Sequence, residues 1–102
     1  MLSLFKNLFK SNSVDLTQLI KDGATIIDVR SKAEFATGHV KGSINIPLEQ
    51  IGSNTEVLKS YAQIITCCRS GNRSGMAKRT LESKGFKNVI NGGSWQNVNQ
   101  SK

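Results

Sequence analysis

Short apolar runs alternate along the chain with segments that have helical periodicity. The first run, residues 25–29, is rich in β-branched residues and has no alternating polar positions, which is typical of a strand buried on both faces. The four runs lie at residues 25–29, 43–46, 63–67 and 87–90. Helices are predicted before and between them, at residues 15–20, 31–37, 55–61 and 73–84. Strands separated by helices predict an α/β fold with a mostly parallel central sheet of about four to five strands and helices on both faces.

Residues with strong capping preferences mark the ends of these helices. Asp15 and Gln18 resemble a capping box at the start of the first helix. Ser31 is a good N-cap for the second helix, and Gly38 follows its end. Gly85 lies where the longest predicted helix needs a left-handed residue to terminate it. The pattern and the caps therefore predict the same elements.

The first ten residues form an amphipathic segment. Their apolar side chains fall on one helical face and are interrupted by lysines; they are Leu4, Phe5, Leu8 and Phe9, with Lys6 and Lys10. The segment lacks the unbroken apolar stretch of a secretory signal and the length of a membrane span. We interpret residues 1–12 as an N-terminal arm and residues 13–102 as one domain. Whether the arm packs on the domain, frays or lies on a membrane surface is left open.

The composition predicts a basic surface. The 102 residues include 14 Lys and Arg against 7 Asp and Glu, which leaves a formal charge of +7. Such a surface attracts small anions as well as nucleic acid. The lysines are scattered, without interleaved aromatic residues, so no nucleic acid is expected as a partner. Small anionic substrates and anionic lipid stay open as partners on the basis of charge alone.

The chain has two cysteines, Cys67 and Cys68, and they are neighbours. Adjacent Cα atoms lie about 3.8 Å apart, which is shorter than the roughly 4.4–6.8 Å span of an ordinary disulfide. A zinc site is not expected either, because His39 is the only histidine and the paired-cysteine spacing is missing. Free thiols favour a reducing compartment, so a cytoplasmic location is expected, with no metal and no cofactor.

Cys68 follows the most apolar predicted strand and precedes the longest predicted helix. In this position the N–H groups of the turn and of the helix N-terminus converge on the sulfur and favour a negative charge. Arg69 and Arg73 add positive charge nearby, and Gly71 gives the turn conformational freedom. These features predict a lowered thiol pKa and a nucleophilic Cys68.

Three separated motifs resemble those of the rhodanese family of sulfurtransferases. The segment Cys68-Arg69-Ser70-Gly71-Asn72-Arg73 is similar to its C-x-x-G-x-R active-site loop. A second signature is matched by Ile27-Asp28-Val29-Arg30, Glu34-Phe35 and the run from Gly38-His39 to Pro47. The run from Gly85 to Gly93 resembles the closing strand. The likeness extends from Asp15 to Trp95, with the motifs in the family's order.

The resemblance implies a single-domain thiosulfate sulfurtransferase. Such an enzyme moves sulfane sulfur from thiosulfate, or a similar donor, to cyanide or a thiol through a persulfide on Cys68. The implied binding loop is Arg69, Ser70, Gly71, Asn72 and Arg73, with Arg73 bracing the loop. The implied supporting residues are Asp28, Arg30, Glu34 and His39, with an ion pair between Arg30 and Glu34.

Two alternatives remain open at this point. A persulfide carrier, or a binding module that acts on a protein partner, would show the same loop. Counting from Cys67 instead gives C-x5-R, the spacing of a cysteine phosphatase or arsenate reductase. Gly71, three residues after Cys68, and Thr66, where phosphatases commonly have histidine, favour Cys68. Cys67 is expected to be a small core residue that points to the other side of the strand.

The C-terminal edge departs from the family pattern. The segment Gly92-Gly93-Ser94-Trp95 separates the paired glycines from the tryptophan by fewer residues than many family members have. Trp95 is expected to plug the core or its edge. No element is predicted for the polar residues that follow.

Overall fold

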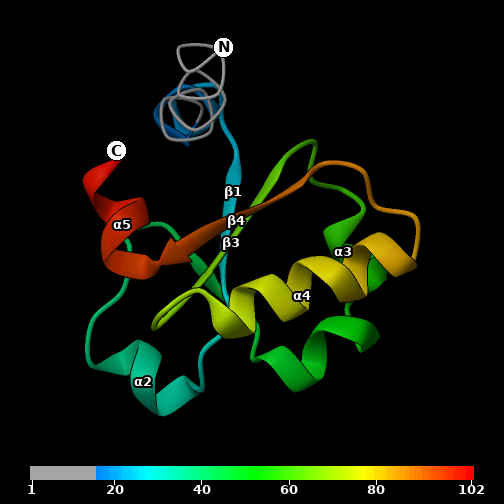
Figure 1. The fold of residues 1–102 in the computed structure, drawn as a ribbon, viewed down its shortest axis with the longest axis horizontal. Coiled ribbons are helices and arrows are strands. Elements are labelled where there is room, and N and C mark those ends of the chain that lie inside the picture. The colour runs from blue at the N-terminus through cyan, green and yellow to red at the C-terminus, as the bar shows by residue number, and fades with distance from the viewer. Residues whose placement is uncertain (1–15) are drawn as a thin grey trace, which may run out of the picture.

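A computed structural model describes residues 16–102 and contains a four-stranded sheet in the order β2-β1-β3-β4 (Figure 1). The strands are β1 (Thr25–Asp28), β2 (Ile44–Asn45), β3 (Ile64–Cys68) and β4 (Val89–Ser94). Every pair of neighbours in this sheet is parallel. The predicted α/β fold is therefore confirmed. The proposed arm at residues 1–12 lies outside the described residues.

Helices connect the strands, as the alternating pattern predicts. They are α2 (Lys32–Ala36), the 3-10 helix η1 (Leu48–Ser53), α3 (Thr55–Leu58), α4 (Asn72–Ser83) and α5 (Trp95–Gln100), after a helical segment at residues 16–21. Helices η1 and α5 were not predicted. No helix in the described part of the chain is long and apolar enough to cross a membrane.

Two apolar clusters cover the two faces of the sheet. One joins strand residues such as Ile64 and Cys68 to Leu58 of α3 and Leu81 of α4. The other joins Ile26, Ile65 and Cys67 to Leu16, before β1, and Val98 of α5. Figure 1 shows α3 and α4 on one side of the strands and α5 on the other. Burial on both faces explains why β3 is apolar at nearly every position.

The ends of the elements follow local chemistry. Ser31 forms a capping box with Glu34 at the start of α2. Gly85 follows α4 with φ of 95°, the left-handed conformation that the sequence predicts there. The structure extends β4 to Ser94, beyond the predicted end at Ile90. Because glycines and an asparagine replace the apolar pattern there, periodicity alone does not indicate the extension.

An extra residue makes a bulge in β4. Thr66 pairs with Asn91 and Cys68 with Ser94, so three steps along β4 match two steps along β3. Gly92 lies within this bulge and has almost no room for a side chain. A Cβ atom there would lie 2.6 Å from Val98 Cγ2 and 2.8 Å from Ile65 Cγ2. The close approach of α5 to the sheet therefore requires glycine.

We predict that Gly92→Ala lowers the free energy of unfolding by about 1–3 kcal/mol, because the added methyl group overpacks the contact between β4 and α5. Urea denaturation followed by circular dichroism measures this loss. Gly52→Ala is the matched control. Its Cβ would meet nothing closer than Lys84 Cε at 3.8 Å, and we expect a change within about 0.5 kcal/mol. Equal losses in the two variants would contradict the explanation.

Candidate active site

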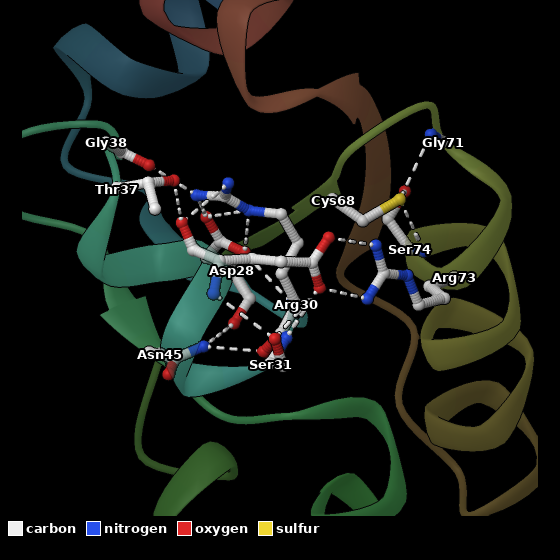
Figure 2. A network of polar contacts seen from close by, with 11 residues as sticks. Asp28, Arg30, Ser31, Thr37, Gly38, Asn45, Cys68, Gly71, Arg73 and Ser74 are labelled. Carbon is white, nitrogen blue, oxygen red and sulfur yellow. Dashed lines mark hydrogen bonds and ion pairs between the residues drawn. The ribbon is translucent and has the colours of Figure 1, made fainter.

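Cys68 is the last residue of β3, and its sulfur lies at the N-terminus of α4 (Figure 2). The Sγ atom accepts hydrogen bonds from the backbone N–H of Gly71 at 3.0 Å and of Ser74 at 3.3 Å. Gly71 is the N-cap of α4, has φ of 99° and supplies no side chain to cap it. Ser74 is the third helical residue, whose N–H usually binds an N-cap oxygen. The sulfur of Cys68 takes the place of that oxygen.

These donors lower the pKa of Cys68 below its ordinary value. Burial of the side chain raises the pKa, but the Ser74 hydroxyl and the backbone N–H groups of Ser74, Ser70 and Gly71 together outweigh it. Hydrogen bonds to the charged form, at the positive end of a helix, stabilise a thiolate. The site therefore favours the nucleophilic form of this cysteine.

Cys67 has the opposite environment, although it is the adjacent residue. Its side chain lies in the apolar cluster on the other face of the sheet, as strand alternation predicts. Burial, followed by the charge of Asp28, raises the pKa of Cys67 to about 12. Cys67 is therefore a protonated core residue at neutral pH, and the expectation that it packs in the core is confirmed.

Arg73 connects the cysteine loop to α2. Its two terminal nitrogens donate to the two carboxylate oxygens of Glu34 at 2.7 and 2.9 Å (Figure 2). The Arg73 hydrogen bond, together with that from the Ser31 backbone, lowers the pKa of Glu34 to about 2. The expected ion pair between Arg30 and Glu34 is therefore wrong. The Glu34 carboxylate lies against Arg73, and Arg30 donates only to its backbone oxygen.

Arg30 instead forms a buried ion pair with Asp28 at the end of β1. Its Nη2 atom lies 2.7 Å from Asp28 Oδ2, and both side chains are almost completely buried. The same guanidinium donates to the carbonyl oxygens of Glu34 and Gly38 and lies over the ring of Trp95. Because these contacts occupy the guanidinium, Arg30 orders the segments beside the site. Trp95 packs against the apolar cluster on this face, as expected.

His39 makes local contacts at the end of α2. Its Nδ1 atom lies 2.8 Å from the carbonyl oxygen of Phe35, and its ring stacks on the Phe35 ring at 3.7 Å between centroids. The ring is exposed. These contacts order the turn before Val40, and they do not bring His39 into the set of side chains around Cys68.

The outer face of the loop is polar and exposed. Arg69, Ser70 and Asn72 are exposed, whereas Arg73 is partly buried against Glu34. Within residues 16–102, Arg69 takes part in no ion pair of the kind that holds Arg73. The structure therefore brings Cys68 and all five predicted loop residues together. Arg73 is held in an ion pair with Glu34, and Arg69 is exposed to solvent.

Sequence reasoning assigned no role to two residues that contact this site. Ser74 is fully buried, and its hydroxyl lies 3.5 Å from Cys68 Sγ and 2.6 Å from Asn91 Oδ1. Asn91 comes from β4 and also donates to the carbonyl oxygen of Gly71 at 3.2 Å. A serine in the first turn of the helix after a reactive cysteine is a signal that the sequence carries. The sequence carries no such signal for Asn91, because only the tertiary structure brings this residue to the loop.

Known proteins are similar in sequence to this chain over most of its length. Residues 13–100 match the family described as Rhodanese-like domain. The chain is 39% identical over 70 residues to the putative sulfur carrier protein YrkF of Bacillus subtilis, which covers 69% of this chain and 38% of YrkF. It is 34% identical over 74 residues to the thiosulfate sulfurtransferase PspE of Escherichia coli, which covers 71% of each. The chain thus spans well under half of the first relative and most of the second.

Solved structures share the fold. The crystal structure of reduced Bacillus anthracis CoADR-RHD matches with a TM-score of 0.73 and 31% identity over 87% of this chain and 16% of that one. A rhodanese with anions from E. coli matches with a TM-score of 0.66 and 32% identity over 74% of this chain and 91% of that one. Because this family's model matches residues 13–100, which is most of the chain, the chain belongs to the family of rhodanese-like domains.

Proposed function

We propose that the chain is a sulfurtransferase that carries sulfane sulfur as a persulfide on Cys68. The observation that supports this most directly is the placement of the Cys68 sulfur. At the start of α4 it accepts hydrogen bonds from the backbone N–H groups of Gly71 and Ser74. A sulfur held in this way is stabilised as an anion before and after it gains a second sulfur atom.

In the first half-reaction the Cys68 thiolate attacks the outer sulfur of thiosulfate. A bond forms between Sγ and that sulfur, the S–S bond of thiosulfate breaks, and sulfite leaves with the bonding electron pair. The charge balances, because a thiolate and a dianion give a persulfide anion and a dianion. Sulfite is a weakly basic leaving group, so the step needs no general acid. The second half-reaction transfers the outer sulfur to cyanide or a thiol and restores the thiolate.

The two loop arginines have different roles in this proposal. Arg73 is held by Glu34 in a two-pronged ion pair, so it braces the loop against α2. Arg69 is exposed and has no ion-pair partner among residues 16–102, so its charge is available to a dianionic donor. Ser70 and Asn72, in the same loop, are polar and exposed. Both cysteines are free thiols, which supports a reducing compartment such as the cytoplasm.

The phosphatase alternative has less support. Its spacing starts at Cys67, which lies on the other face of the sheet and has a pKa of about 12. A phosphatase also needs its loop arginine for the phosphate, whereas Arg73 is bound to Glu34. A persulfide carrier that serves a protein partner uses the same Cys68 chemistry. The likeness to a putative sulfur carrier supports that version of the proposal.

We expect incubation with thiosulfate to add one sulfur atom, about 32 Da, to the intact protein, because the Cys68 thiolate keeps the transferred sulfur. Mass spectrometry under non-reducing conditions measures the gain. Cys68→Ala should abolish it. Cys67→Ala is the matched control and should retain it, because Cys67 is protonated and lies on the other face. Loss of the adduct only in the Cys67 variant would overturn the assignment, as would an unmodified wild-type protein.

We expect Arg69→Gln to raise the KM for thiosulfate about five- to tenfold with a smaller effect on kcat, because the lost charge attracts the dianion before the chemical step. Steady-state thiocyanate formation at low ionic strength measures both constants. Arg79→Gln removes another exposed charge, from α4, and should leave KM within about twofold. Equal effects of the two substitutions would show that general surface charge, rather than Arg69, attracts the donor.

A further inference from the structure

The hydroxyl group of Ser74 lies between two acceptors. Its oxygen is 2.6 Å from Asn91 Oδ1 and 3.5 Å from Cys68 Sγ (Figure 2 shows Ser74 and Cys68). A hydroxyl has one proton and two lone pairs. When the Ser74 hydroxyl donates to Asn91, its oxygen turns a lone pair to the sulfur and can accept a hydrogen bond from the S–H group of Cys68. This arrangement suits the neutral thiol.

Loss of the thiol proton changes which acceptor the Ser74 hydroxyl favours, Asn91 or the sulfur of Cys68. A lone pair of Ser74 would then face an anionic sulfur, whereas its proton could make a charge-assisted hydrogen bond to that sulfur. Turning the proton to Cys68 breaks the neutral bond to Asn91. The amide oxygen of Asn91 is not left without a donor, because it keeps the backbone N–H of Gly93 at 2.9 Å.

We infer that Asn91 is a positioning residue that controls how readily Cys68 loses its proton, by competing with the sulfur for the single hydroxyl proton of Ser74. The inference rests on the proposed role of Cys68 as the nucleophile. Asn91 opposes formation of the thiolate, and Ser74 promotes it once its proton is released. The two residues together set the fraction of reactive sulfur at a given pH.

The surrounding structure fixes the amide of Asn91 in this position. Its Nδ2 atom donates to the carbonyl oxygen of Gly71, in the loop that surrounds the sulfur. A Cβ atom at position 75, in the first turn of α4, would lie only 3.2 Å from the same Nδ2 atom. Glycine is otherwise unfavourable within a helix, and here it leaves room for the amide. Asn91 pairs with Thr66 just before the bulge in β4, so its place is fixed by the regular part of the sheet.

Charged groups also act on the thiol, and the test must leave them unchanged. Strands β3 and β4 and helix α5 contain no charged residue. The charged groups are Arg73 on α4, Glu34 on α2, Arg69 in the loop, Asp28 and Arg30 at the end of β1, and Arg79 of α4, whose guanidinium lies beside Gly75 next to the Asn91 amide. Asn91 is neutral, so its replacement by a neutral side chain isolates the hydrogen-bond effect.

The test is the pH titration of the Cys68 thiol in Asn91→Leu, followed by thiolate absorbance near 240 nm and by the rate of alkylation with iodoacetamide. Leucine branches at the same carbon as asparagine and replaces the acceptor oxygen with a methyl group. We expect the pKa of Cys68 to fall by about 0.5–1 unit, because the Ser74 hydroxyl no longer has to break a hydrogen bond to Asn91 before it donates to the thiolate. Asn91→Ala should give a smaller fall. Cys67, with its pKa of about 12, does not titrate in this range.

The Ser74→Ala background separates this effect from a structural one. Ser74→Ala alone should raise the pKa of Cys68, and adding Asn91→Leu to it should cause no further fall. If Asn91 only holds the loop in shape, its loss loosens the N–H donors and raises the pKa equally in both backgrounds. That result would overturn the inference, as would a fall of the same size without Ser74. Asn91 is exposed, so Asn91→Leu should fold both alone and together with Ser74→Ala, which thermal melts verify.

No sulfur donor is present in this titration, so its outcome is independent of the persulfide assay. A shift of the predicted sign without any thiosulfate adduct would support the competition for the proton and reject sulfur transfer from thiosulfate. An adduct without the shift would do the reverse.

Discussion

The hydrogen bonds from Gly71 and Ser74 to the Cys68 sulfur are the constraint on which the rest of the site depends. They require a strand that ends at Cys68, a turn of three residues with a left-handed glycine, and a helix that begins at once. They also connect stability to chemistry, because the first turn of α4 is capped by the atom proposed to react. A helix that needs an acceptor at this point stabilises the anionic sulfur in return.

Three supports surround this core of the site, and each comes from a different part of the chain. Arg73 reaches Glu34, 39 positions away, and joins the loop to α2. Asp28 and Arg30 order the end of β1 and the turn after α2 through a buried ion pair. Asn91 reaches the loop from β4, just before the bulge in that strand. All three act at the carboxyl ends of parallel strands, where open α/β sheets place their sites. The topology brings them together, and the side-chain contacts then determine the geometry.

The sequence predicted the parts that depend on local pattern. The apolar run before Cys68 and the length of α4 follow from burial and periodicity, and the left-handed Gly85 follows from the end of that helix. Tertiary contacts decided the rest. The bulge in β4 and the short α5 have too little apolar pattern to be recognised, since Val98 is the one buried side chain of α5. The sequence predicted an ion pair between Glu34 and Arg30, four residues away, whereas the folded chain brings Arg73 to the Glu34 carboxylate.

Adjacent cysteines on opposite faces of one strand have a consequence for the lifetime of a bound sulfur. A neighbouring thiolate within reach would attack a persulfide, release hydrogen sulfide and leave both cysteines joined. Cys67 does not meet either condition, because it is protonated at neutral pH and its side chain lies across the sheet. Under the proposed function, a loaded Cys68 has no resolving partner beside it within the described chain. The sulfur then stays on the protein until an acceptor arrives from outside.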